Sequence, residues 1–275
     1  MQFVVVRHSS AFCEPDCPQW IAAEGRITSD SAVKLERFLG NATYRKLPVL
    51  LTSPGGDLIA AMRMGRTLRK YAMTTAVGDS QLFGCEKDDL MAGKCRPDSV
   101  LMAYNGLTSE KAFCASACPL VLLGGTTRIV SPSSLVGLHE PKSTAQPYID
   151  RYIIHYRLVN GRKEEISRSF LKRTYLPVKT TIGVTPDLRK KFESYIKDMG
   201  GSAEIVDEME KAAPANMDWI SGYDGTRERL GLVSSASTPA ALEDLSGPTS
   251  CNPQKTMSPN CVHLKAKEPQ KTAAP

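Results

Sequence analysis

The sequence predicts an α/β fold with a parallel βαβ core, formed by a single domain that a C-terminal tail follows. Short apolar runs typical of strands alternate with amphipathic helical patterns over residues 3–77, which is the signature of right-handed βαβ units. A Gly-Gly turn follows one of these runs at Gly55-Gly56. Further along, Ser116 lies among small residues before a helical segment, and His139 closes a strand-like run. These observations predict both the fold class and the place of a site.

The first third of the chain supplies the parallel core. We expect strands at residues 3–6, 20–23, 47–51 and 73–77 because their apolar runs are short and bounded by turn residues. Thr28 or Ser29 caps a helix that runs to about Leu39. A second amphipathic helix runs from Asp57 to Tyr71, where the carboxylate at its start suits the helix dipole.

The middle third carries an insertion and the serine turn. Residues 79–110 are polar and rich in glycine, so we expect an inserted loop. Residues 113–123 then predict a turn at Ser116 followed by a helix of small residues. Two strands follow at 127–130 and 135–139.

The last third predicts helices at residues 147–175, 186–199 and 202–211. Arg162 and Lys163 interrupt the apolar face of the first of these helices, so we expect a small homo-oligomer, a dimer or trimer at most. Residues 235–275 are rich in Ser, Thr, Pro and Lys, with few large apolar groups to bury. The domain therefore spans residues 1–234, and residues 235–275 form a low-complexity tail.

The net charge of +6 comes from one segment. Residues 151–200 contain twelve Lys or Arg and five Asp or Glu. Such a segment attracts acidic partners or membrane headgroups, or it is the solvated side of amphipathic helices, and the helical spacing of its apolar residues favours the second interpretation. We expect no nucleic-acid partner, and no apolar run reaches the 18 residues of a membrane span.

The eight cysteines predict an oxidising compartment. They lie in four sequence-local pairs, which are Cys13 and Cys17, Cys85 and Cys95, Cys114 and Cys118, and Cys251 and Cys261. Local pairing is the simplest of many connectivities and is typical of disulfides in secreted proteins. We therefore expect a periplasmic or secreted protein whose signal peptide has been removed. Zinc is disfavoured because no Cys-x-x-Cys occurs and histidines are few, so we expect neither a metal nor a cofactor.

Three features together supply the parts of a serine acyl-transfer site. They are Ser116 between small residues, His139 at a strand end, and the Gly-Gly turn after residues 47–51. Two plain alternatives stay open. Ser116 is alternatively a small residue selected for tight packing, and His139 a core histidine that donates to a backbone carbonyl.

The chain resembles the Clp protease proteolytic subunit, within the broader Clp protease/crotonase fold. The resemblance spans residues 20–233 and rests on these motifs in order: Ser53–Gly56, Ser116, His139–Pro141, Trp219–Ser221 and the expected strand Gly231–Val233. It implies a spiral superhelix of ββα units. The chain also looks like a bacterial branch of predicted periplasmic proteins with a Cys-Ala-Ser-Ala-Cys core.

The resemblance also implies roles for single residues. Ser116 would be the nucleophile and His139 its general base, with the backbone N–H groups of Gly56 and Ala117 as the oxyanion hole. The family's acid would fall near Ala213, which has no carboxylate. Asp207 and Asp218 are nearby, and Asn216 is the candidate third member because asparagine also orients a histidine in some proteases.

Two function classes follow. The first is a secreted or periplasmic serine peptidase-like hydrolase that acts on a peptide or protein with a Ser-His pair and a backbone oxyanion hole. The second is a catalytically inactive scaffold that keeps the fold and binds a peptide or protein partner. An acyl-CoA enzyme of the crotonase type ranks below both, because the two glycine-bearing turns carry no carboxylate that points inward.

Overall fold

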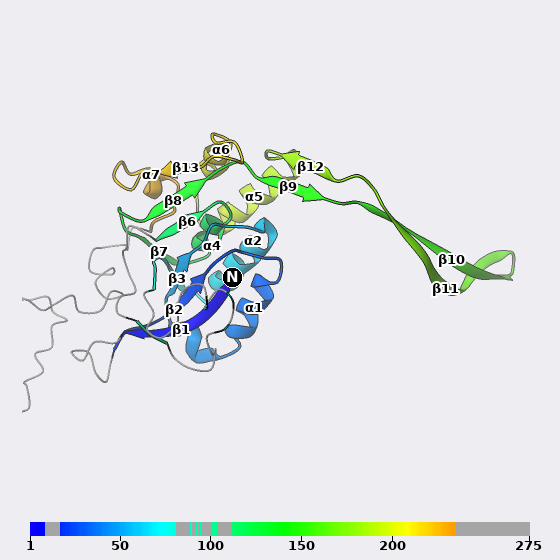
Figure 1. Cartoon of the computed structure of the whole chain (residues 1–275), viewed down its shortest axis with the longest axis horizontal. Coiled ribbons are helices and arrows are strands. Elements are labelled where there is room, and N and C mark those ends of the chain that lie inside the picture. The colour runs from blue at the N-terminus through cyan, green and yellow to red at the C-terminus, as the bar shows by residue number, and fades with distance from the viewer. Residues whose placement is uncertain are drawn as a thin grey trace, which may run out of the picture.

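The computed structural model describes residues 1–8, 17–80, 89, 92, 94, 101–103 and 112–234. Its body is built on a six-stranded sheet whose strands lie in the order β5-β1-β2-β3-β4-β7 (Figure 1). The bounds are β1 Gln2–His8, β2 Gln19–Glu24, β3 Val49–Thr52, β4 Thr74–Val77, β5 Leu101–Ala103 and β7 Thr127–Val130.

Most of this sheet is parallel, as the sequence predicts. Strands β2, β3, β4 and β7 run in one direction, and β5 runs parallel to β1. Among the described strands of this sheet, only β1 and β2 form an antiparallel pair, in which Val4 lies opposite Ala22. The expected strands of the parallel core are confirmed with small shifts of their ends.

Helices α1 (Ser31–Phe38) and α2 (Leu58–Lys70) connect the first parallel strands and pack on the sheet (Figure 1). Asp57 caps α2 because its carboxylate accepts a hydrogen bond of 2.7 Å from the N–H of Ala60. Alternate residues of β2 and β3, among them Ile21 and Leu51, join the apolar faces of both helices in one buried core. A short 3-10 helix η1 (Ala42–Lys46) leads into β3.

A second sheet and a buried helix carry the serine turn. The sheet contains β13 (Asp218–Ile220), β8 (Leu135–Leu138) and β6 (Phe113–Ala115) in this order, with β6 parallel to β8. Helix α4 (Cys118–Leu123) follows β6 and is buried along its whole length. Gly124 at the end of α4 lies against Gly65 of α2, where any added Cβ would overlap backbone atoms.

The prediction of a helix over residues 147–175 is wrong. The segment forms two long antiparallel strands, β10 (Tyr148–Val159) and β11 (Arg162–Tyr175), which extend away from the body (Figure 1). Asn160 and Gly161 between them have φ angles of 51° and 77°, the two positive values that a type I′ hairpin turn requires. Strands β9 (Lys142–Ala145) and β12 (Lys179–Ile182) pair with each other at its base. We call β10, β11 and their turn the arm.

The C-terminal part of the domain is helical, with one difference from expectation. Helices α5 (Pro186–Asp198) and α6 (Glu204–Met209) lie where the sequence predicts them. The strand expected at Gly231–Val233 is a turn, which follows the short helix α7 (Thr226–Arg229). The helix α7 ends at a left-handed Gly231, whose φ of 72° redirects the chain.

Several predicted features lie wholly or mostly outside the described residues. These are most of the inserted loop 79–110, the tail 235–275, and the cysteines at positions 13, 85, 95, 251 and 261. Cys114 and Cys118 do form a disulfide, and Cys17 is also disulfide-bonded. None of the helices in the described ranges is long and apolar enough to cross a membrane.

Candidate active site

Ser116 occupies a strained turn between β6 and α4. Its φ angle is 60°, in the left-handed region that residues other than glycine seldom enter. Such a conformation costs of the order of 1 kcal/mol or more and persists only where surrounding structure imposes it. A sharp strand-to-helix turn of this kind holds a serine hydroxyl clear of the strand that precedes it. Ser116 is partly exposed although both neighbours, Ala115 and Ala117, are buried.

Two covalent and hydrogen-bonded restraints hold this turn. The disulfide between Cys114 and Cys118 brackets Ser116, with 5.1 Å between the two Cα atoms. The N–H of Ser116 donates a hydrogen bond of 2.9 Å to the carbonyl of Gly137 on strand β8. The turn is therefore fixed to the strand that leads to His139.

His139 lies at the same edge of the second sheet as Ser116. Strands β6 and β8 are parallel neighbours with Ala115 opposite Gly137, so Ser116 and His139 both follow the carboxyl ends of adjacent strands. Adjacent strands lie about 4.8 Å apart with a rise of about 3.3 Å per residue, which brings these two side chains into one neighbourhood. Within the described chain, the hydroxyl of Ser116 makes no hydrogen bond, to His139 or to any other residue. A direct bond between the two stays a prediction.

The imidazole of His139 is held by a backbone group. Its Nδ1 lies 2.6 Å from the carbonyl oxygen of Glu140. A carbonyl only accepts hydrogen bonds, so Nδ1 carries the proton and Nε2 of the neutral ring has the free lone pair. The next residue is fixed as well, because the N–H of Glu140 donates a hydrogen bond of 2.8 Å to the carbonyl of Ala212. The ring is thus set in the tautomer that a general base needs.

The glycine turn after β3 packs directly on the serine turn. A Cβ at Gly55 would lie 2.6 Å from Cβ of Ser116 and 2.7 Å from the backbone nitrogen of Ala117. The φ of Gly55 is also positive, at 86°. Only glycine satisfies both the conformation and the close approach.

Hydrogen bonds tie this glycine turn to its surroundings. Ser53 exchanges backbone hydrogen bonds with both sides of Cys114, which extends β3 alongside β6. Its hydroxyl accepts from the N–H of Gly55 at 3.0 Å and donates to the carbonyl of Gly25 at 2.8 Å. On the other side, Ile27 bonds with the backbone of Gly55 and Asp57. The turn is rigid before any substrate arrives.

In the described part of the chain, the two N–H groups expected in an oxyanion hole have no acceptor. Among the described residues, none takes a hydrogen bond from the N–H of Gly56 or from that of Ala117. Both groups belong to the two turns that pack on each other at Gly55 and Ser116. An oxyanion hole needs unpaired, preorganised donors of this kind beside the nucleophile.

The structure does not join the candidate third members to His139. Asn216 lies exposed in a turn, where its N–H donates to the carbonyl of Ala213, and its side chain makes no hydrogen bond with the imidazole. Asp207 pairs with Arg189. Asp218 lies opposite Leu138 in the sheet. The carbonyl of Glu140 takes the Nδ1 position instead. The hydrogen bond is the one that the alternative for His139 predicts, but His139 is only partly buried and is not a core histidine.

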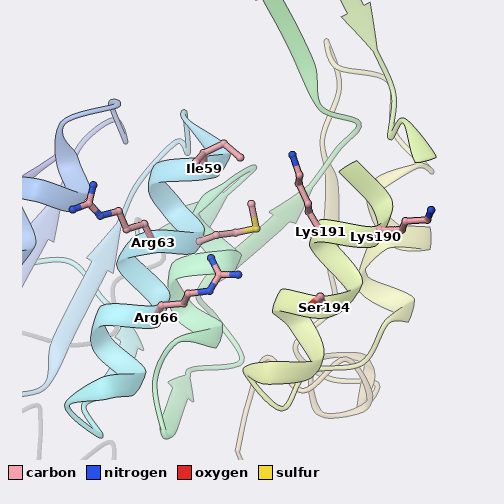
Figure 2. Close-up of a pocket in the computed structure, with 7 residues that line it drawn as sticks. Ile59, Arg63, Arg66, Lys190, Lys191 and Ser194 are labelled. Atoms are coloured by element: carbon pink, nitrogen blue, oxygen red, sulfur yellow. The ribbon is translucent and has the colours of Figure 1, made fainter. Parts of the chain in front are cut away.

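A separate cleft lies between α2 and α5 (Figure 2). It has a volume of about 600 Å³, and its lining includes Arg63, Arg66, Lys190 and Lys191. Arg63 is neutralised by Glu36, and the guanidinium holds the pKa of that carboxyl below its usual value. The cleft contains neither Ser116 nor His139 and is not part of the site described above.

Metal ligands do not gather in the described part of the chain. No group of three or more His, Cys, Asp or Glu side chains is placed there to hold an ion.

Comparison with known proteins gives similarity in structure alone. No protein-family model matches the chain, and no curated protein matches its sequence. A mutant of the 1510-N membrane-bound stomatin-specific protease is 15% identical, with a TM-score of 0.42 and coverage of 80% of each chain. A second mutant of that protease, in complex with a substrate peptide, is 15% identical, with a TM-score of 0.40 over 78% of this chain and 71% of that one. ClpP1 from Listeria monocytogenes is 13% identical, with a TM-score of 0.40 over 77% of this chain and 86% of that one.

The likeness concerns the fold. At these identities and TM-scores the comparisons assign no role to any residue of this chain.

Proposed function

We propose that the protein is a serine hydrolase of the peptidase type, with Ser116 as nucleophile and His139 as general base. The observation that supports this is a strained, partly exposed serine and a histidine that follow the carboxyl ends of adjacent parallel strands. The Nδ1 of the histidine is occupied, and among the described residues its Nε2 has no hydrogen-bond partner. A small residue selected only for packing does not require a left-handed conformation, which costs stability. Strain held by a disulfide and a glycine turn is typical of a functional position.

The reaction is ordinary acyl transfer. The hydroxyl oxygen of Ser116 attacks the substrate carbonyl while its proton passes to Nε2 of His139. The N–H groups of Gly56 and Ala117 stabilise the negative oxygen of the tetrahedral intermediate. The intermediate collapses as His139 gives the proton to the leaving amine. Water, deprotonated by the same ring, then releases the acyl group and restores the serine.

The carbonyl of Glu140 takes over part of the work of a triad aspartate. It fixes the tautomer and orientation of His139 through Nδ1. A neutral carbonyl dipole stabilises the imidazolium less than a full negative charge does. We therefore expect turnover slower by orders of magnitude than that of a complete triad, with Asn216 contributing little.

A peptide substrate fits the open edge beside the site. Strand β9 begins three residues after His139, is exposed throughout, and pairs with β12 on one side only among the described strands. An extended peptide adds to such an edge through main-chain hydrogen bonds. The disulfide at Cys114 and Cys118 supports our placing the reaction in the periplasm or outside the cell.

The test is labelling with a fluorophosphonate, which reports an activated serine whatever the substrate. Wild-type protein should label at one site, identified by mass spectrometry as Ser116, and Ser116→Ala should not label. His139→Gln should label far more slowly at equal concentration. The matched control is Ser133→Ala, an exposed serine on the loop before β8, which should label like the wild type. Folded wild-type protein that resists labelling would overturn the proposal.

The second candidate function is an inactive scaffold that binds a peptide or protein. It is favoured by one observation, that no carboxylate contacts His139 in the described chain. Absence of labelling combined with retained binding of an extended peptide, measured by calorimetry, would select it.

A further inference from the structure

The arm is a long surface that the rest of the described chain leaves uncovered. Its twelve register pairs join β10 to β11, and neither strand pairs with any other described strand. Twelve residues at about 3.3 Å each make it roughly 40 Å long. Figure 1 shows it standing out from the body on the side away from β1. A two-stranded hairpin alone in water is marginally stable, so a structure of this length requires a partner.

The arm exposes several large apolar side chains. Tyr148, Tyr152, Tyr156, Phe170 and Tyr175 are each 43–60% exposed. Exposed aromatic groups scattered singly need no explanation, but a continuous row marks an interaction site. These five residues come from both strands and need to share one face to form such a row.

The register and the ring contacts place them on one face. Tyr148 lies opposite Tyr175 and Tyr152 opposite Phe170, with ring centroids 6.2 and 5.9 Å apart. Tyr156 follows on the same side because successive even positions of β10 share a face. We call this the aromatic face; it also carries Ile154 and Leu158.

The charges on the aromatic face are almost cancelled within it. Arg173 lies 3.7 Å over the ring of Tyr148 and forms two hydrogen bonds, of 2.7 and 2.8 Å, with the carboxylate of Asp150. Arg168 lies over the ring of Tyr152 and pairs with Glu165 at 2.9 Å. Only Lys163, over the ring of Tyr156, lacks a carboxylate partner on this face. The face is therefore near neutral.

The opposite face is basic. The register places four cationic residues and one carboxylate, that of Glu164, on it; the cations are Arg151, Arg157, Arg162 and Lys172. Its apolar residues are fewer, among them Ile149 and Ile153. Two such faces would repel each other, whereas two aromatic faces would not.

We propose that the aromatic face binds the same face of a second copy of this chain, so that two arms pack about a two-fold axis. A near-neutral face of rings and paired arginines is self-complementary, which a two-fold interface requires. A face about 40 Å long and roughly 12 Å wide presents roughly 500 Å² per copy, so two copies reach the ~1,000 Å² that a specific interface needs. Tyrosine and arginine are the residues enriched at the centres of such interfaces.

A lipid surface fits this face less well. Entering a bilayer would bury the ion pairs Asp150–Arg173 and Glu165–Arg168 in hydrocarbon, where charged groups are costly. Between two proteins the same pairs stay hydrogen-bonded to each other, and Arg168 and Arg173 stay packed on the rings of Tyr152 and Tyr148. Lipid binding is therefore an outcome that the test must distinguish.

The test is the oligomeric state of the full chain, measured by sedimentation velocity over a dilution series into the tens of micromolar. The wild type should be a dimer at the upper end. Tyr152→Ser combined with Phe170→Ser should raise the dissociation constant at least 100-fold. The matched control changes the basic face, with Ile149→Ser and Ile153→Ser, and should leave the dimer intact. Circular dichroism should show all variants folded; if the first pair misfolds, Tyr148→Ser with Tyr175→Ser replaces it.

Three results would overturn the proposal. They are a wild type that stays monomeric throughout the series, equal weakening by the basic-face control, and a monomer that sediments with vesicles of phosphatidylglycerol in an aromatic-face-dependent manner. Labelling of Ser116 does not enter any of these readouts, so the proposal stands or falls separately from the proposed activity.

Discussion

The body and the arm use similar residues in opposite ways. Leu51 of β3 is completely buried between a parallel sheet and its helices, whereas Leu171 of β11 is 55% exposed in a hairpin with solvent on both faces. In the body, apolar side chains supply stability by leaving water. In the arm, apolar side chains remain in water, so they add little to the stability of the isolated chain. The difference indicates that the body is stable as a single chain, while the residues of the arm are suited to a partner.

The test with the largest expected effect on stability truncates one leucine in the body and one in the arm. Leu51→Ala should lower the free energy of unfolding by about 3 kcal/mol, because it removes buried methyl groups and leaves a cavity. Leu171→Ala should change it by less than about 0.5 kcal/mol, since Leu171 is exposed and has no cross-strand partner in the register. Urea unfolding followed by fluorescence of the buried Trp20 measures both. A similar loss from both variants would show that the arm unfolds together with the body.

A second test compares two arginines. Arg227 is 3% exposed and donates hydrogen bonds to the carbonyls of Ser131, Ser134 and Ile220. Arg227→Met should cost about 2–3 kcal/mol, because buried carbonyls lose their donors. Arg157→Met in the arm removes only an exposed pair with Glu164 and should cost less than about 1 kcal/mol. Thermal unfolding of the two variants at equal protein concentration compares them, and equal melting temperatures would contradict the buried role of Arg227.

The same contrast explains which parts of the fold could be predicted. The parallel strands of the body are short apolar runs with turn residues on both sides, and it is their short length and their flanks that favour a strand over a buried helix. In the arm, Tyr148, Tyr152 and Tyr156 recur every four residues, a spacing that fits one face of a helix and equally one face of a strand. The pattern alone could not decide between them. Asn160-Gly161 was the deciding signal, since this pair favours a hairpin turn and ends a helix.

The candidate site also has residues that the sequence could predict and others that it could not. Ser116, His139 and the Gly-Gly turn could be found because each role requires a particular residue type. The partner of His139 could not, because the carbonyl of Glu140 is a backbone group that any residue supplies. The packing of Gly55 on Ser116 joins positions far apart in the sequence, and only the fold brings them together.

The third and smallest test uses two glycines with similar backbone angles. Gly55 and Gly161 have φ values of 86° and 77°, so alanine at either position is strained by about 1 kcal/mol. Gly161→Ala should cost only this strain, because nothing lies within 4 Å of the added Cβ. Gly55→Ala should cost about 1–2 kcal/mol more, since its Cβ would lie 2.5 Å from the carbonyl oxygen of Ala115 and overlap Ser116. The overlap moves the serine turn away from the glycine turn that carries the N–H of Gly56. Labelling of Ser116 by a fluorophosphonate should therefore fall in Gly55→Ala and stay unchanged in Gly161→Ala. Chemical unfolding and labelling of the same samples give both quantities. Normal labelling in a folded Gly55→Ala protein would show that the glycine turn stabilises the body without shaping the site.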